Sequence, residues 1–191
     1  MDMRTAVEWL NAVKAGGMAS YLVAAASCAV TAFRAPNSRL SRLAALLCLI
    51  HGWLLLDIAF DWRWRLYDWL RREAVAWHWY EERRWPQAVT LAILAFVLIS
   101  GILAARSRLR SWQGAPAAVQ GTLLSAGCWI MEIISLHVTD SVLYHRIGPL
   151  MVISFVWLLA CAMVTAGILR AGISASRVAD SAEVMHRKIA G

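Results

Sequence analysis

Five long apolar runs constrain this chain more than any other feature of its sequence. They cover residues 15–33, 43–60, 88–105, 117–136 and 147–169. A transmembrane helix needs about 17–25 mostly apolar residues, and each run meets that requirement. A helix also satisfies its own backbone hydrogen bonds, as a segment inside a bilayer must. The sequence therefore predicts an all-α integral membrane bundle of about five transmembrane helices, forming a single membrane domain over residues 1–191.

Composition excludes the common soluble classes. Hydrophobic residues make up 60% of the chain and charged residues only 16%, whereas a soluble domain has about 25% charged residues. The net charge of +7 does not indicate a nucleic-acid partner, because the arginines cluster between apolar runs, as they do beside membrane spans. The four cysteines lie inside apolar runs without a CxxC pair, which is typical of small buried side chains. We therefore expect a lipid bilayer around the chain and no nucleic acid.

Loop charges predict the orientation. With five spans, the 34–42 and 106–116 loops lie on the same side as the 171–191 tail, and both loops carry arginines but no acidic residue. Short basic loops favour the cytoplasmic side, so the sequence predicts a multi-pass membrane protein with a cytoplasmic C-terminus, which in a bacterium would lie in the inner (plasma) membrane. Residues 1–14 are expected to form a short interfacial helix, and residues 171–191 a solvated or surface-lying tail.

The connection over residues 61–87 is rich in tryptophan and arginine. Its tryptophans are Trp62, Trp64, Trp69, Trp77, Trp79 and Trp85. Tryptophan prefers the headgroup level of a bilayer, where its ring is buried and its N–H stays wet. We expect one or two helices lying in the interface, either as a plain membrane anchor or as part of a functional site.

Ionisable residues inside or beside the spans suggest a site. Asp57 is late in the second run and Glu132 late in the fourth, and His137 and Asp140 follow. Both runs cross in the same direction, so these residues lie toward the membrane face that also carries the 61–87 connection. Charged groups at such depths usually face the bundle interior and mark function.

Their spacing favours a metal. His137–Asp140 and His78–Glu81 are i, i+3 pairs, which share a helix face, although helical di-iron sites use the reverse order, carboxylate before histidine. Oxygen-rich ligands with one or two imidazoles suit iron or manganese better than structural zinc. The predicted ligands are Asp57, Glu81, Glu132, His137 and Asp140, supported by Arg71, His78, Tyr80 and Arg84. The alternative is a structural network in which the acids pair with Arg63, Arg65, Arg71, Arg83 or Arg84.

His51 lies in the middle of the second run. A membrane haem takes axial histidines from facing helices, and neither the fourth nor the fifth run offers one at matching depth. A haem held by this chain alone is therefore not expected, and His51 is predicted to form a hydrogen bond inside the bundle.

Two short motifs resemble those of a group of uncharacterised small bacterial inner-membrane proteins. One is Trp79-Tyr80-Glu81-Glu82-Arg83-Arg84 ending in Gln87, preceded by Leu56-Asp57 and Arg71; the other runs from Ser135 through His137 to Asp140. The chain departs from the group's pattern at His78, where the group has glycine, and at Val138, where it has a second histidine. The resemblance implies a shared site of Asp57, Arg71, Tyr80, Glu81, Arg84, His137 and Asp140, and brings no activity with it.

Two functions remain open on the sequence. The first is a membrane metalloprotein, an oxidoreductase acting on a lipid, a quinone or oxygen. The second is a non-enzymatic accessory or scaffold subunit, or a homo-oligomer, whose Trp/Arg-rich face docks other membrane subunits, since these residue types are enriched at binding hot spots.

Overall fold

The computed structural model describes residues 3–34, 38–78, 82, 84–110, 112–134, 137–148 and 150–190, and side chains within these ranges from residue 12 to residue 178 except 137–139. The elements are α1 (Met3–Arg34), α2 (Arg39–Phe60), α3 (Trp62–Ala76), α4 (Arg84–Arg108), α5 (Ala115–Ile134), α6 (His137–Leu143), β1 (Arg146–Ile147), β2 (Leu150–Met151) and α7 (Val152–Ala190). The predicted all-α class is confirmed.

Five helices are long and apolar enough to cross a membrane, as predicted. The candidate spans are Ala12–Arg34, Arg39–Phe60, Arg84–Arg108, Ala115–Ile134 and Val152–Val178. The chain is thus a multi-pass membrane protein by the length and composition of its helices.

The structure corrects three boundaries. The predicted short helix over 1–14 is wrong, because α1 is continuous from Met3 to Arg34. The fifth span begins at Val152 rather than 147, because β1 and β2 form an antiparallel hairpin just before it. Residues 84–87, which we assigned to the interfacial connection, belong to the first turn of α4, where Pro86 is tolerated since its missing N–H has no helical partner there. The predicted tail continues α7 as a helix to Ala190.

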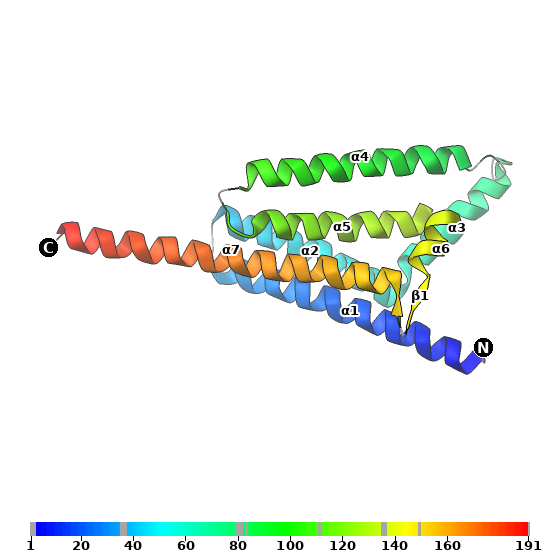
Figure 1. The fold of residues 1–191 in the computed structure, drawn as a ribbon, viewed down its shortest axis with the longest axis horizontal. Helices are drawn as coiled ribbons and strands as arrows, with labels where there is room; N and C mark the ends of the chain where they lie inside the picture. The colour runs from blue at the N-terminus through cyan, green and yellow to red at the C-terminus, as the bar shows by residue number, and fades with distance from the viewer. Residues whose placement is uncertain are drawn as a thin grey trace.

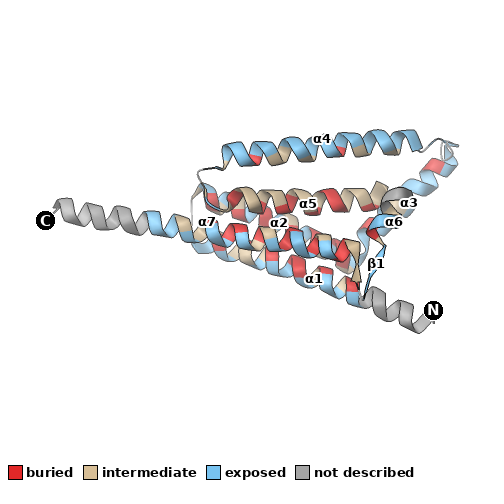
Figure 2. Cartoon of the chain, in the orientation of Figure 1, coloured by how far each residue is buried: buried red, intermediate tan, exposed pale blue. Residues whose placement is uncertain are grey.

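Helices α1, α2, α5 and α7 form the bundle, while α4 lies along one side against α5 (Figure 1). Buried positions concentrate between the four bundle helices, and α4 is exposed over most of its surface (Figure 2). Helix α5 packs closely on α7 at Gly121, where an added Cβ would overlap the carbonyl oxygen of Ala160. Small residues let helix backbones approach closely in membranes.

Helix α3 runs obliquely across the end of the bundle where α2 and α5 end (Figure 1). The sharp turn from α2 into α3 is made at Asp61, which has a left-handed conformation with φ of 58°. This conformation is uncommon for a residue other than glycine, and aspartate adopts it more readily than most. The turn sets Arg63, two residues later, against the bundle interior, where it is buried.

Candidate functional site

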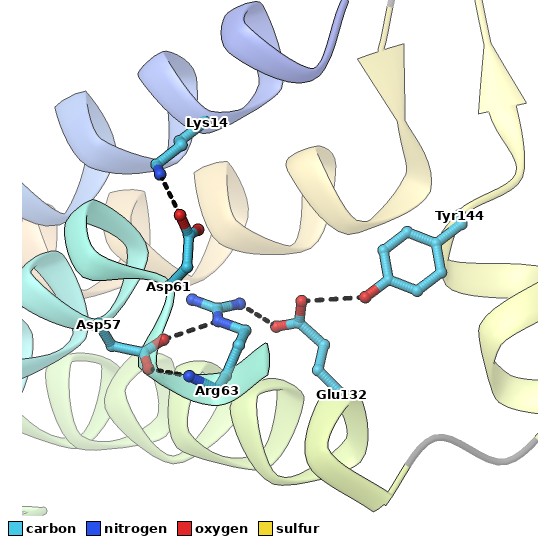
Figure 3. A network of polar contacts seen from close by, with 6 residues as sticks. All are labelled: Lys14, Asp57, Asp61, Arg63, Glu132 and Tyr144. Carbon is cyan, nitrogen blue, oxygen red and sulfur yellow. Dashed lines mark hydrogen bonds and ion pairs between the residues drawn. The ribbon is translucent and has the colours of Figure 1, made fainter. Parts of the chain in front are cut away.

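A buried arginine joins three helices at this end of the bundle. Arg63 of α3 donates from Nε to Oδ2 of Asp57 on α2 at 2.7 Å, and from Nη1 to Oε2 of Glu132 on α5. All three residues are almost fully buried. Its guanidinium also lies over the ring of Trp157 on α7, with Cζ 5.5 Å from the ring centroid, in reach of a cation–π interaction. Arg63 is therefore a clamp: its two ion pairs join α3 to α2 and α5 (Figure 3), and its contact with Trp157 adds α7.

Asp57 does more than neutralise the arginine. Its Oδ1 accepts the backbone N–H of Arg63 at 2.9 Å, so the carboxylate also caps the first turn of α3. A carboxylate at a helix N-terminus satisfies a free donor and stabilises the helix dipole. The same side chain thus holds both the start of α3 and its buried arginine.

Glu132 is held from two sides. Its second oxygen, Oε1, accepts from the Tyr144 hydroxyl at 3.2 Å, and Tyr144 follows α6. Burial raises the pKa of the Tyr144 hydroxyl, and the nearby Glu132 carboxylate raises it further, so the tyrosine stays protonated and acts as the donor. Burial alone would lower the pKa of Arg63, but the Glu132 and Asp57 carboxylates outweigh that effect and raise it.

A cavity of about 470 Å³ lies beside this network. Its polar wall contains Lys14, Asp61, Arg63 and Glu132. Lys14 of α1 is paired with Asp61 at 2.7 Å, and both side chains are well exposed, so this pair is screened and contributes little stability. The cavity therefore has a buried side at Arg63 and Glu132 and a more exposed side at Lys14 and Asp61.

The structure brings some of the predicted site residues together. Asp57 and Glu132 meet on Arg63, the arrangement expected of the structural alternative. Asp140 lies half-buried in the first turn of α6. His137 begins the same helix, but its side chain lies outside the described residues, as do Tyr80 and Glu81 entirely. Among the side chains that are described, no group of three or more His, Cys, Asp or Glu could hold a metal ion. The five-ligand iron or manganese site stays a prediction.

The supporting residues are spread out. Arg71 is exposed on α3 and Arg84 is exposed at the start of α4. The predicted helical pairing of His78 with Glu81 is wrong at His78: α3 ends at Ala76, and His78 lies exposed in the following turn with φ of 57°. The helix stops there because the His78 N–H bonds to the carbonyl of Val75, three residues earlier. An α-helix requires a bond to the residue four positions earlier, so the helical hydrogen-bond pattern ends at this point.

His51 behaves as expected of a hydrogen-bonded bundle histidine. It is fully buried, and its Nδ1 donates to the Leu47 carbonyl one turn earlier at 2.9 Å. The ring lies 6.0 Å from that of Tyr21 on α1. His51 therefore packs α1 against α2 and takes part in none of the ion pairs of the Arg63 clamp.

Sequence reasoning missed two contributors to the site. Tyr144 carries no motif, and only its position just beyond the fourth span places it at the right depth. Trp157 reads as one more apolar residue of the fifth span, yet its ring supports the Arg63 guanidinium. It can do so because Gly17 leaves room: a Cβ there would come within 2.8 Å of the Trp157 ring.

Comparisons with known proteins add no identity to this geometry. The chain matches no family model, no curated protein and no solved structure.

Proposed function

We propose that this protein is a non-enzymatic accessory subunit of a larger membrane complex, and that helix α3 is its docking surface. The observation that supports this is the Arg63 clamp. The two intramembrane carboxylates that suggested a catalytic site are both engaged by one arginine, and that arginine fixes α3 in place across the end of the bundle.

A fixed helix is a good docking element. Arg65, Trp69 and Arg72 occupy positions i, i+4 and i+7 of α3 and are all exposed, so they form one stripe along the helix. Tryptophan and arginine are the residue types most enriched at binding hot spots. Because the clamp orders α3 beforehand, a partner does not have to supply that ordering free energy.

Charge indicates what kind of partner fits the stripe. Arg65, Arg71 and Arg72 border a recess of about 700 Å³ with one acidic residue, Asp68. A membrane protein that presents acidic side chains at headgroup level would be complementary to this surface.

We further propose that the complex lies in a bacterial inner membrane with the C-terminus of this chain in the cytoplasm. Basic helix ends support this orientation, because short basic loops favour the cytoplasm. Helix α1 ends at Arg34, α2 begins at Arg39 and α4 ends at Arg108, and these three helix ends lie at the bundle end opposite α3 (Figure 1).

Native mass measurement after gentle extraction from membranes tests the docking role. We expect a complex of constant stoichiometry that contains a second protein, and Arg65→Gln/Arg72→Gln should lower its yield by about tenfold, the loss of a hot-spot contact. The matched control, Arg108→Gln/Arg110→Gln, removes the same charge at the opposite end and should leave the complex intact. A species that contains only this chain, or equal loss in both variants, would contradict the proposal.

Metal analysis of the same preparation separates this function from the metalloprotein. The accessory role predicts less than about a tenth of an equivalent of iron or manganese, since ligands of a bound metal hold it near full occupancy. A full equivalent that is lost on Asp140→Asn would instead support a metal centre, because an amide is a poor substitute for a ligating carboxylate.

A further inference from the structure

We propose that the cavity beside Arg63 binds an uncharged amphipathic molecule, with a carbonyl or hydroxyl oxygen at its polar end and an apolar body. This goes beyond the docking role of α3 and does not depend on it. The cavity volume of about 470 Å³ falls within the range of roughly 300–1,000 Å³ that is usual for small-molecule sites.

The polar end is inferred from a buried donor. The Arg63 side chain is only 5% exposed and lines the cavity. Its Nε and Nη1 are bonded to carboxylates, but its Nη2 is buried without a hydrogen-bond partner among the described residues. A buried charged donor left unsatisfied is costly. An acceptor oxygen at the end of a ligand would satisfy it.

Charge selects the type of head group. The cavity wall carries two cations, Lys14 and Arg63, and two carboxylates, Asp61 and Glu132. All four are already in ion pairs, Lys14 with Asp61, and Arg63 with Glu132 and with Asp57 behind it. A carboxylate or phosphate head would meet Glu132 and Asp61 without a free cation to pair with, and an ammonium head would meet Arg63 and Lys14. Both would bring an unpaired charge out of water. A neutral oxygen-bearing head avoids this cost and still accepts from Nη2.

The rest of the wall fits an apolar body. Val13, Ile58, Ile153 and Trp157 line the cavity and are buried. The Trp157 ring lies under the guanidinium, so it continues the apolar wall directly from the polar end. One site thus offers a hydrogen-bond donor beside an apolar surface, the combination that orients an amphipathic molecule.

Photolabelling tests the assignment on the full chain in nanodiscs. The probe is methyl nonyl ketone with a diazirine near the end of its chain, and the competitors are unlabelled methyl nonyl ketone, nonane, decanoate and decylamine. We expect saturable labelling of peptides that contain Val13, Ile58 or Ile153. The ketone should compete at concentrations about tenfold lower than either charged analogue, because a mispaired buried head group loses at least that much affinity.

A cavity-filling variant provides the structural control. Met151→Trp enlarges a half-buried side chain that lines the cavity from β2 and makes none of the ion pairs of the clamp, and it should abolish most of the labelling. Ile93→Trp on exposed α4 adds the same ring outside the cavity and should not change the labelling.

Three results would overturn the site: labelling that rises linearly with probe concentration, competition by nonane as strong as that by the ketone, or labelling that survives Met151→Trp. Better competition by decanoate or decylamine would overturn the neutral head group. Met151→Trp should leave the complex of α3 intact, so this test and that of the docking role fail independently.

Discussion

Helices α4 and α5 lie side by side and are both candidate spans, yet they relate to the bundle in opposite ways. Over its 25 residues α4 has two buried residues, Leu94 and Ala105, whereas α5 buries eight of its 20 residues, Glu132 among them. The exposed helix α4 nevertheless contains the more hydrophobic continuous stretch of 18 residues. In a soluble protein the reverse would be expected.

The difference follows from the solvent. Lipid tails are as apolar as leucine, so a bilayer gives no hydrophobic reason to bury an apolar helix. What needs burial is a polar group, because it has no water to bond in the membrane core. Helix α5 is inside because it carries Glu132 and the small residues that allow close packing with α7. Helix α4 can remain at the edge because it has no charged residue from Trp85 to Ala105.

The largest expected loss of stability follows from removing Arg63, the cation that pairs with Glu132 of α5. Arg63→Met leaves the Asp57 and Glu132 carboxylates buried without a cation, which should lower the free energy of unfolding by about 3–5 kcal/mol. Arg106→Met at the exposed end of α4 should change it by less than about 0.5 kcal/mol. Unfolding in mixed detergent micelles, followed by circular dichroism, measures both.

A second variant separates charge from packing in that result. Asp57→Asn/Arg63→Met/Glu132→Gln removes all three charges with little change in shape and should recover much of the stability, since replacing a whole buried network is often close to neutral. If Arg63→Met lowers the free energy of unfolding no more than Arg106→Met does, the clamp does not hold the bundle together. The burial of Glu132 would then not explain why α5 lies inside the bundle.

The second prediction compares the two faces of α5 itself. A methyl group at Gly121 meets the Ala160 backbone on α7, which cannot move aside, whereas at Gly127 it meets the flexible tip of Leu98 on α4. Gly121→Ala should cost about 1–3 kcal/mol through overpacking. Gly127→Ala should be close to neutral, because the shift of Leu98 is offset by the gain in helix propensity of about 1 kcal/mol. Equal costs measured in the same unfolding assay would show that α4 is packed as tightly as α7.

The fold was largely predictable because the bilayer simplifies it. Length and apolarity alone placed five spans, and the direction of the second and fourth spans alone placed Asp57 and Glu132 at one end. The errors occurred where local backbone conformation matters. Gly148 and Pro149 signal a turn in the sequence, but strands of two residues on either side are too short to show the alternation that predicts a hairpin. Nothing near His78 marks the end of α3 except a backbone turn that only the three-dimensional chain reveals.

The site was predictable in its residues but not in their pairing. Five arginines near the two acids were candidate partners, and only the left-handed turn at Asp61 selects Arg63 by pointing it inward. Tyr144 and Trp157 could not be recognised, because their roles arise from contacts between segments that are distant in sequence. Pairing of charges depends on side-chain direction, which hydropathy does not encode.

The smallest expected effect lies on α4. Ile93 and Leu94 are neighbours of nearly equal size, but Ile93 is 58% exposed and Leu94 only 8%. Ile93→Ala should leave the free energy of unfolding within about 0.5 kcal/mol of the original, because lipid surrounds that side chain both in the assembled bundle and in the separated helix. Leu94→Ala removes packing against α5 and should cost about 1 kcal/mol or slightly more, below the usual range for a buried leucine, since α4 has a single helix as its main neighbour. Both variants are measured in the assay used for Arg63→Met. A loss at Ile93 as large as that at Leu94 would mean that the exposed face of α4 is covered by protein in solution, and the contrast between the two helices would then describe an isolated chain rather than the assembled one.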